Sequence, residues 1–302
     1  MSRILTIGTK GGDVAAWQQF LSEQGFNPGP VDGDFELGTQ QATIQFQRRE
    51  GLGDDGVVGP NTYAAAGKFS FAIPEDVPPM GDGALDHIGD STIFQTADGR
   101  VIYYTAGMEI DADGAFRAYK DGNDGLDYDQ NGKDQNGNWV GVLTDGNGKP
   151  IEQKDGDPAP GYYISTTSLQ DLTRPKTDPR RYVDAESIPY IVLPGGHLGN
   201  ASLGDYAIVI NTRTGKRIAA IVADAGPKHK IGEASIATAR ELLGNDHCSP
   251  RNGGTEKAYI RYIVFPNSRD GVFPASFEGI SGRTEKLLAG LEPETVQSLA
   301  IA

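Results

Sequence analysis

Cysteine, long apolar runs and positive charge are all scarce in this 302-residue chain. Its single cysteine, Cys248, excludes an intrachain disulfide, and a lone thiol is typical of a small buried core residue. No uninterrupted apolar run of roughly 18 residues is present, so we expect no membrane-spanning helix. A formal net charge of −14 argues against nucleic acid and anionic membranes as partners, because phosphate binding needs clustered Lys and Arg. An acidic surface instead suits a neutral or cationic ligand, such as an aminated sugar polymer.

Several catalytic and targeting motifs are also missing. The four histidines contain no H-x-x-x-H pair, no G-x-S-x-G elbow is present, and no nucleophile motif surrounds Cys248. The sequence therefore supports neither zinc hydrolysis nor acyl-transfer chemistry, and we expect no metal and no cofactor. The first residues, MSRILTIGTKGGDV, lack the apolar core of a secretory signal. If the target lies outside the cytoplasm, a dedicated secretion apparatus or cell lysis has to deliver the protein.

Glycine and proline, by contrast, are abundant. The 41 glycines and 18 prolines, with 37% hydrophobic residues, predict a loop-rich, β-rich body around a real core. Residues 1–68 differ from this pattern, because three stretches there predict helices: GGDVAAWQQFLSEQGF, GTQQATIQFQRREG and NTYAAAGK. Asp13 is the expected N-cap of the first helix and Gly25 its expected end. Between the helices an internal repeat, D-G-x-[FV]-x-x-x-T, occurs as DGDFELGT and again as DGVVGPNT.

Residues 1–68 as a whole resemble the peptidoglycan-binding domain found at the ends of many wall hydrolases. The resemblance rests on four segments in matching order: GGDVAAWQQFL, GFNPGPVDGDF, FQRREGL and DGVVGPNTY. It departs at FELGT, where the family usually has a Gly-Pro or similar pair before the Thr. The resemblance implies a small all-α three-helix module that binds the cell wall. A helical bundle serving only as a structural cap is the alternative.

The rest of the chain is predicted to be mainly β. Residues 69–90 are rich in Pro, Gly and Asp without periodicity, and we expect a linker there. Beyond it, hairpins are expected around Asp98-Gly99 and Thr214-Gly215, with further strands at YYISTTSL, IPYIVLP and AYIRYIVFP, the last of them central. One helix is expected at SIATARELLG, with Ser235 as its N-cap and Gly244 as its end. Because strands outnumber helices, the sequence predicts a barrel-like or sandwich-like body with few helices.

Two acids in the segment ADAGPKHKIGEAS, residues 223–235, form a candidate catalytic pair. A glycosidase needs one carboxylic acid to protonate the leaving oxygen and one carboxylate to activate water or attack directly. Asp224 is expected where a buried strand ends, and desolvation there raises a carboxyl pKa. Glu233 is expected just ahead of a helix N-terminus, whose dipole favours the ionised form. The spacing alone leaves open a solvated hairpin in which neither acid is catalytic.

The same segment is similar to the D-[TA]-G-P…G-E-A-S signature of glycoside hydrolase family 75, the chitosanases. Further segments agree in order, so that the resemblance covers roughly residues 90–266: MEIDADGAFRAY, GNWVGVLTDGNGKPI, DPAPGYYISTTSLQD, YVDAESIPYIVLPGG, LGDYAIVIN and YIRYIVFP. It implies a catalytic domain over 91–302 with a mainly-β, double-psi-barrel-like fold. It also implies Asp224 and Glu233 as the catalytic pair in inverting endo-hydrolysis of β-1,4 linkages in a glucosamine polymer, without a cofactor. Secreted fungal members carry several cysteines, and this departure puts the substrate specificity in question.

Six residues are candidates for substrate binding: Asp111, Asp113, Trp139, Tyr163, Thr167 and Asp205. The first two follow a predicted strand and are either cleft residues or turn formers. The two aromatic residues are either platforms for a sugar, whose pyranose C–H face stacks on a ring, or packing residues. The threonine lies in a segment that matches the family, and Asp205 either binds an amino group or caps a turn.

The segment DYDQNGKDQNGN is a partial match to a calcium-binding loop. Asp127, Asp129 and Asn131 fit the first half of an EF-hand loop. Position twelve is Asn138, which cannot supply the closing bidentate carboxylate, and no helices are predicted on either side. The sequence therefore favours a solvated Asx-rich loop, and calcium binding stays open.

Two functions are compatible with these features. The first is a cell-wall-targeted endo-glycoside hydrolase acting on chitosan or on peptidoglycan glycan, in the setting of an antibacterial effector or a phage-type lysin. The second is a non-catalytic wall-binding protein whose hydrolase domain is degenerate. A polysaccharide is the expected partner in both cases, and the sequence identifies no immunity or secretion partner.

Overall fold

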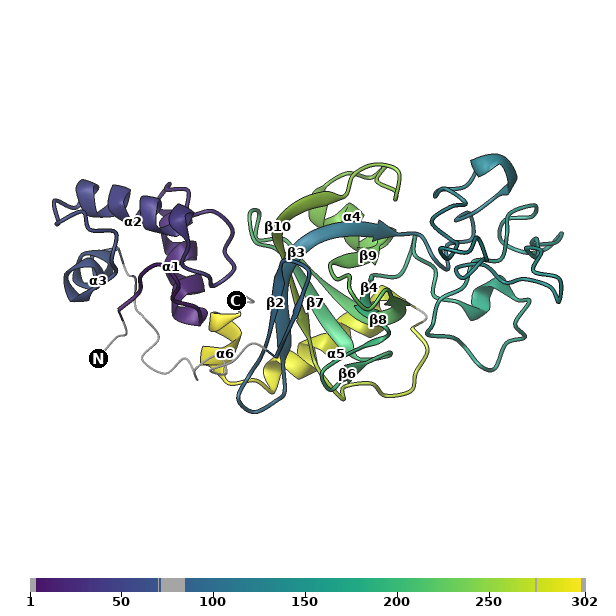
Figure 1. Cartoon of the computed structure of the whole chain (residues 1–302). Helices are drawn as coiled ribbons and strands as arrows, with labels where there is room; N and C mark the ends of the chain where they lie inside the picture. Colours follow the sequence, from purple (N-terminus) through teal and green to yellow (C-terminus); the bar gives the residue numbers. More distant parts are fainter. Residues whose placement is uncertain (1–3, 70, 72–84, 275, 300–302) are drawn as a thin grey trace. The chain divides into compact units, whose positions relative to one another are not determined.

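A computed structural model describes residues 4–69, 71, 85–274 and 276–299 of the chain (Figure 1). The chain divides into two compact units: Met1–Asp86 with Phe94–Arg100 and Gly290–Ala302, and His87–Ile93 with Val101–Ala289. The linker predicted over 69–90 lies mostly outside the described residues. None of the helices in the described part of the chain has the length and apolar character needed to cross a bilayer.

The N-terminal unit contains the three predicted helices: α1 (Gly12–Glu23), α2 (Leu37–Arg49) and α3 (Pro60–Gly67). The indole of Trp17 is fully buried at the centre of their core, with its ring centroid 5.2 Å from Phe20 and 5.5 Å from Phe46. The predicted cap of the first helix is wrong. Gly11 is its N-cap, and Asp13 lies inside the first turn. There its negative charge still interacts favourably with the positive end of the helix dipole.

A buried glutamine fastens the first copy of the internal repeat to the helix before it. The Gln18 side-chain amide donates to Asp32 Oδ1, the Asp34 carbonyl and Thr39 Oγ1, at 2.9, 2.9 and 3.0 Å. Its Oε1 accepts from the backbone N–H groups of Asp32 and Gly33. The Asp and Thr of the first repeat copy, Asp32 and Thr39, are thus both partners of one side chain.

Gln47 of α2 does the same for the second copy. Its amide donates to Asp55 Oδ1, the Val57 carbonyl and Thr62 Oγ1, at 2.8, 2.9 and 3.1 Å. Its Oε1 accepts from the Gly56 backbone N–H at 2.8 Å. The repeat unit is therefore longer than the eight-residue pattern, because each copy includes a glutamine from the preceding helix.

A closed six-stranded barrel forms the core of the second unit (Figure 1). Around the ring its strands are β3 (Ile102–Asp111), β10 (Thr255–Val264), β7 (Tyr206–Asn211), β8 (Arg217–Gly226), β4 (Tyr190–Pro194) and β9 (Glu233–Ser235). A parallel pairing of β3 with β9 closes the ring, and β4 with β8 is also parallel. The predicted mainly-β, barrel-like domain with few helices is confirmed, with β10 in a central position.

Shorter elements complete this unit. Strands β1 (Asp86–Ile88) and β2 (Ser91–Gln95) extend the sheet beside β3, and β5 (His197–Leu198) pairs with β6 (Ala201–Ser202). Helices α4 (Ile236–Leu243) and α5 (Phe277–Ala289) pack on β7 and β8, which explains why every residue of β7 is buried. As predicted, Ser235 caps α4 and Gly244 ends it in the left-handed region, at φ 66°. Helix α6 (Pro293–Ser298) belongs to the first unit.

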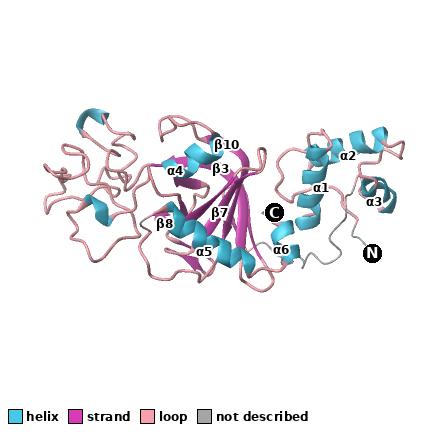
Figure 2. Ribbon diagram, turned by 180° about the vertical axis from the view of Figure 1, so that it is seen from behind, coloured by secondary structure: helices cyan, strands magenta, loops and turns pink. Residues whose placement is uncertain are grey.

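Residues 112–189, between β3 and β4, are almost entirely loop, interrupted only by the short 3₁₀ helices Asp121–Asn123 and Pro179–Arg181 (Figure 2). The predicted strand YYISTTSL is therefore wrong: Tyr163 and Ser165 form only isolated bridges, to Glu152 and Val142. The physical reason is that the loops around this segment are rich in Asp and Asn, and the segment itself in Ser and Thr, whose side chains bond to nearby backbone groups and compete with strand pairing. Asp145 is an example, since its Oδ1 accepts from the N–H groups of Asn147 and Lys149.

Candidate active site

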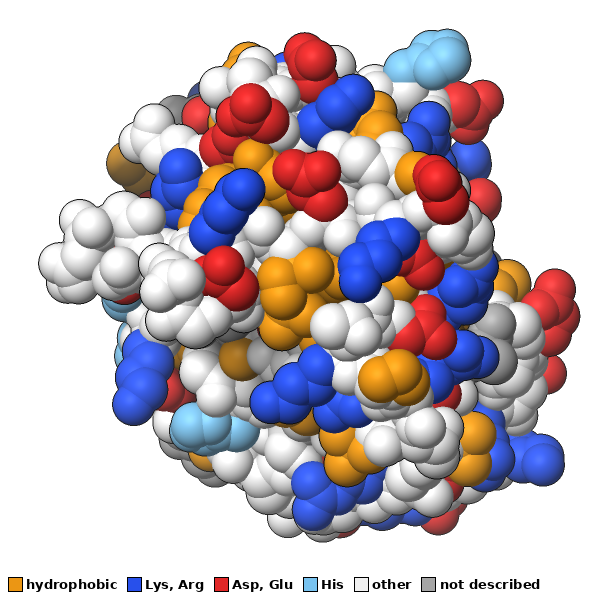
Figure 3. All heavy atoms as spheres, turned by 90° about the vertical axis from the view of Figure 1, so that its right-hand side faces the viewer, with side chains coloured by type: hydrophobic (Ala, Val, Ile, Leu, Met, Phe, Trp, Pro, Cys, Tyr) orange, Lys and Arg blue, Asp and Glu red, His pale blue; other side chains and the backbone are white. Residues whose placement is uncertain are grey.

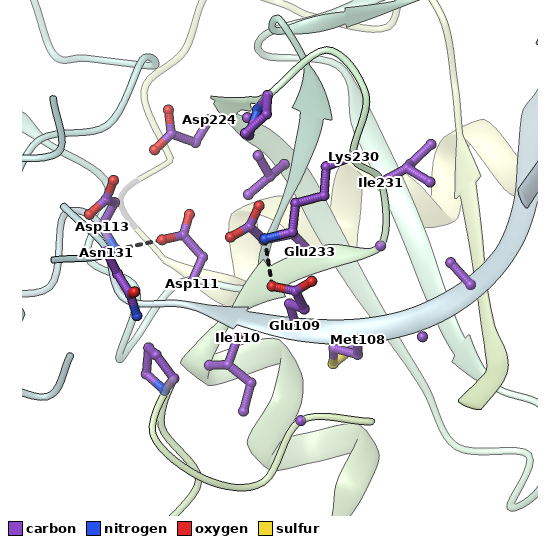
Figure 4. A pocket seen from close by; sticks show the side chains of 18 of the residues that line it. Met108, Glu109, Ile110, Asp111, Asp113, Asn131, Asp224, Lys230, Ile231 and Glu233 are labelled. Carbon is purple, nitrogen blue, oxygen red and sulfur yellow. Dashed lines mark hydrogen bonds and ion pairs between the residues drawn. The ribbon is translucent and has the colours of Figure 1, made fainter. Parts of the chain in front are cut away.

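A cleft of about 1400 Å³ lies at the β3, β8 and β9 side of the barrel. Carboxylates dominate the polar side chains of its wall. Nine acidic residues line it: Asp90, Glu109, Asp111, Asp113, Asp127, Asp134, Asp224, Glu233 and Glu256. The lysines and arginines in the lining are Lys133, Lys230 and Arg251. Figure 4 shows that the acids of β3, β8 and β9 point toward one another across this space.

The strand pairing fixes the separation of Asp224 and Glu233. Val192 of β4 pairs with Asp224 on one side and with Glu233 on the other. Because neighbouring strands lie about 4.8 Å apart and the barrel wall curves, the two Cα atoms are separated by less than two spacings, at most roughly 9–10 Å. The β4–β8 register shifts between Ile191 and Val192, so that Ala223 is an extra residue in β8. Such a bulge re-aims the side chain that follows it, here Asp224.

Asp224 is nearly inaccessible, with 8% of its surface exposed. Its Oδ1 accepts three hydrogen bonds, from the Ser168 N–H at 3.0 Å, the Ser168 hydroxyl at 2.6 Å and the Ala225 N–H at 2.7 Å. Burial raises the pKa of Asp224, although these donors oppose the shift. Since Oδ1 already holds three donors, a proton on this carboxyl belongs on Oδ2.

Glu233 starts β9 and is half-buried. Burial raises the pKa of Glu233, the Lys230 ammonium lowers it, and the charges of Glu109 and Asp224 raise it further. The expectation that a helix terminus would favour ionised Glu233 is therefore wrong. The reason is that β9 separates Glu233 from α4, and Ser235 is the residue that caps that helix.

Asp111 and Asp113 also face the cleft, from the end of β3 (Figure 4). Asp111 Oδ1 accepts from the Asp113 N–H at 2.8 Å, and Asp113 Oδ1 accepts from the Tyr119 hydroxyl at 2.8 Å. Burial raises the pKa of both carboxyls well above the usual range. Neighbouring negative charges add to the shift, above all that of Glu233 at Asp111 and that of Asp111 at Asp113. The site thus concentrates four acids that resist simultaneous ionisation.

Replacing Asp113 by Asn is expected to stabilise the protein at neutral pH. In the unfolded chain this carboxyl ionises near its ordinary pKa, whereas the folded state holds the proton to higher pH. Folding stability is therefore lost as the pH rises above about 4, and Asp113→Asn removes that loss. Thermal unfolding should show a higher Tm for Asp113→Asn at pH 7.5, by about 2–4 °C for each kcal/mol recovered.

The difference should vanish near pH 2.5, well below the ordinary aspartate pKa of about 3.9, where Asp113 is protonated in both states. The matched control is Asp145→Asn, because Asp145 is exposed and its backbone hydrogen bonds lower its pKa. That variant should show no gain at pH 7.5. Equal gains for both variants would contradict the assigned cause.

Two further predicted substrate-binding residues lie outside the cleft lining. Asp205 is fully buried and accepts from the backbone N–H groups of Ser202, Asn267 and Arg269, so that it joins two loops. Thr167 is buried as well. Its hydroxyl donates to the Leu169 carbonyl at 2.8 Å and accepts from the Val183 N–H at 3.0 Å. The structure places both residues in hydrogen-bond networks that hold loops together.

The two predicted sugar platforms pack against each other. Trp139 and Tyr163 have ring centroids 5.5 Å apart in an edge-to-face arrangement, and Tyr119 lies 5.9 Å from Trp139. The Lys133 ammonium covers the indole, with Nζ 4.3 Å from the ring centroid. Neither Trp139 nor Tyr163 lines the cleft. Through Tyr119, however, this aromatic cluster supports the Asp113 carboxylate.

In the candidate calcium half-loop, Asp127 uses one carboxylate oxygen internally, whereas Asp129 Oδ1 is buried without a hydrogen-bond partner. Asp127 Oδ1 accepts from the Tyr128 N–H and from Asn131 Nδ2, both at 2.7 Å. Among the described residues, no group of three or more His, Cys, Asp or Glu side chains is arranged to hold a metal ion. Figure 3 shows the face on which the 112–189 loops lie, where acidic, basic and hydrophobic side chains are interspersed.

Sequence reasoning missed three hydroxyl groups of the site. Ser168 binds Asp224, Tyr119 binds Asp113, and the Tyr190 hydroxyl donates to the Asp113 carbonyl at 2.9 Å. Ser168 lies in a segment that matched the hydrolase signature, which was the available signal. Tyr119 and Tyr190 also lie in matching segments, but their roles were not predicted, because only the fold brings them to the end of β3.

A cleft lined by carboxylates from several strands suits the hydrolysis of a glycosidic bond, which uses a pair of acidic side chains. Residues 108–278, more than half of the chain, match the family described as fungal chitosanase of glycosyl hydrolase group 75. The chain belongs to this family and is, at the level of the family, a glycoside hydrolase. Residues 10–66 match the peptidoglycan binding domain family, which confirms the resemblance of the helical module. The chain thus combines a domain of a glycosyl hydrolase family with a domain of a peptidoglycan-binding family.

Two individual proteins are similar to the helical part of the chain. N-acetylmuramoyl-L-alanine amidase CwlM of Mycobacterium tuberculosis is 48% identical over 71 residues, which is 22% of this chain and 18% of the amidase. The chain thus spans less than a fifth of the length of that curated relative. The crystal structure of the SleB N-terminal domain matches with 35% identity and a TM-score of 0.23, covering 24% of this chain and 97% of that one.

Proposed function

We propose that the chain is an endo-glycosidase that hydrolyses β-1,4 linkages of an amino sugar polymer with inversion. Asp224 is the general acid and Glu233 the general base. The observation that carries the proposal is that both residues pair with Val192, from opposite sides, and line one cleft, which supports a separation of up to two strand spacings between their Cα atoms. Carboxyl groups about 6.5–9.5 Å apart leave room for a water molecule on the far side of the sugar ring, whereas retaining enzymes hold them about 5–5.5 Å apart.

The surroundings of each carboxyl support these two roles. Asp224 is the more deeply buried, and its three donors on Oδ1 leave Oδ2 to carry the proton that the leaving oxygen receives. Glu233 lies beside the Lys230 ammonium, which opposes protonation and suits a base. Protonation of the leaving group and activation of water then proceed from opposite sides of the bond.

The cleft favours a cationic substrate. Its acidic side chains outnumber its lysines and arginines three to one, so a glucosamine unit with a free ammonium group is attracted. Chitosan carries this group at most units, whereas peptidoglycan glycan is acetylated and bears acidic peptides. We therefore expect the cleft to prefer chitosan-like segments over peptidoglycan glycan as substrate.

The helical module supplies the targeting in this proposal. We assign residues 1–68 to wall binding, 69–90 to a linker and 91–302 to catalysis, since family matches fall within the first and last of these ranges. An antibacterial effector is one setting that such a combination fits.

Parallel digestion of two purified substrates tests the proposal. The full chain is incubated with soluble chitosan and with purified peptidoglycan, and the products are followed by reducing-end release and by mass. We expect oligomers of glucosamine from chitosan that shorten the polymer rapidly, as an endo-acting enzyme does. Release of reducing ends from peptidoglycan but not from chitosan would show that the expected substrate preference is wrong. No release from either would favour a wall-binding protein without activity.

A further inference from the structure

Lys230 occupies a distinctive place in the cleft, because its ammonium lies between two neighbouring carboxylates (Figure 4). Its Nζ is 2.5 Å from Glu109 Oε2, and its charge also acts on Glu233. Lys230 belongs to the loop between β8 and β9, where its N–H donates to the Pro227 carbonyl at 3.1 Å and closes a turn. This turn positions the Lys230 side chain next to the start of β9 (Figure 4).

The β3–β9 pairing that closes the barrel brings the two carboxylates beside Lys230 close together. Glu109 and Glu233 are register partners in the parallel β3–β9 pair that closes the ring, and the Glu109 N–H donates to the Gly232 carbonyl at 2.8 Å. Like charges directly opposite each other in a sheet destabilise it. A cation between them removes this repulsion, and Lys230 provides it.

We propose that Lys230, anchored by Glu109, is a positioning residue that keeps the Glu233 carboxylate charged and directed into the cleft. The inference rests on the proposed function, in which Glu233 is the base. Glu109 suits the anchoring role because its side chain is 63% exposed, so that water solvates its charge while it binds the lysine. Glu233 is half-buried and depends on Lys230 for compensation of its charge.

Groups from every neighbouring element act on Glu233. They are Glu109 and Asp111 of β3, Asp113 and Asp127 of the following loop, Asp224 of β8, Tyr262 of β10 and Lys230, while β4 contributes the apolar Val192. Of these groups, Lys230 is the cation. The other ionisable groups carry negative charge or none, so removing the lysine leaves Glu233 among like charges.

Two substitutions are expected to shift the pKa of Glu233 in opposite directions. Lys230→Met removes the cation and should raise the pKa of Glu233, which lowers the rate about tenfold on the acidic side of the pH profile. Glu109→Gln removes a like charge but keeps an oxygen that accepts from Lys230, so the pKa of Glu233 should fall. Lys230→Arg keeps the charge and should restore the wild-type profile. A purely structural role would not produce shifts of opposite sign.

The experiment uses the full chain with ¹³C-labelled glutamate and follows the side-chain carboxyl resonances by NMR from pH 3 to 9. The Glu233 resonance is identified by its loss in Glu233→Gln. The kcat and KM for soluble chitosan are measured over the same pH range. Lys228→Met is the matched control, because Lys228 is exposed in the same loop and does not line the cleft. It should shift neither the resonance nor the rate profile.

The two readouts separate failure of the inference from failure of the proposed function. Opposite shifts of the Glu233 resonance, with an acidic limb of kcat that follows them and a nearly constant KM, support the inference. If Lys230→Met and Glu109→Gln do not shift the Glu233 resonance in opposite directions, or if Lys228→Met shifts it as much as they do, the inference is overturned even in an active enzyme. If the resonance shifts as expected but no substrate is cleaved, the proposed function fails instead. Should Lys230→Met not fold, Lys230→Gln and Glu109→Gln carry the same test.

Discussion

Asp224→Asn and Glu233→Gln are each expected to lower kcat on chitosan by about 10²–10⁴-fold, the usual contribution of a general acid or base. Asparagine at 224 keeps the oxygen that accepts from Ser168 and Ala225, but it replaces the proton-carrying Oδ2 with an amide. Glutamine at 233 keeps the shape of the side chain and loses the ability to take a proton from water. Initial rates of reducing-end release measure both effects.

The fold should survive both substitutions. The Tm of each variant should equal or exceed that of the wild type, because each removes a carboxyl whose pKa burial raises. Asp145→Asn and Glu241→Gln are matched controls at exposed positions and should retain full activity. If Asp224→Asn and Glu233→Gln are as active as these controls, the catalytic assignment is wrong.

The second large effect concerns the helical module. Gln18→Leu or Gln47→Leu should unfold it, because each change removes three donated bonds and leaves buried backbone N–H groups without their acceptor. Each buried polar group left without a partner costs about 1–3 kcal/mol. A module of this size has only a few kcal/mol of stability to lose. Retention on insoluble cell wall should therefore be abolished, while hydrolysis of soluble chitosan continues at the wild-type rate.

Gln45→Leu is the matched control for the change in α2. Gln45 lies two residues before Gln47, but its side chain is exposed. Gln45→Leu should bind the wall as tightly as the wild type and show the same unfolding transition. If Gln47→Leu retains wall binding and the same unfolding transition as Gln45→Leu, the glutamine anchors are not essential. If it instead abolishes hydrolysis of soluble chitosan, the two functions are not separable in the way proposed.

Regular patterns in the sequence predicted the helical module and the barrel strands well. Apolar spacing predicted α1 to α3, and long β-branched runs predicted β7, β8 and β10, because local periodicity reflects which face is buried. The caps at Ser235 and Gly244 were also predicted, since their chemistry is local. The extra residue Ala223 was not, because a bulge depends on the partner strand.

The environment of the catalytic candidates was harder to predict. Both acids were found from a local motif, but the opposed pKa shifts expected for them were wrong, since burial dominates at both Asp224 and Glu233. Burial depends on loops from 112–189 and on the closure of β3 against β9, which no local pattern encodes. Glu109 was missed for the same reason: only the β3–β9 register places it beside Glu233.

The anomeric form of the first products tests the central proposal most directly. The full chain is mixed with soluble chitosan in an NMR tube, and the anomeric protons of the new reducing ends are recorded before mutarotation equilibrates them. Hydrolysis of a β-1,4 linkage with Asp224 as acid and Glu233 as base should release the α-anomer first. Release of the β-anomer first, or the absence of any new reducing end, would contradict the account.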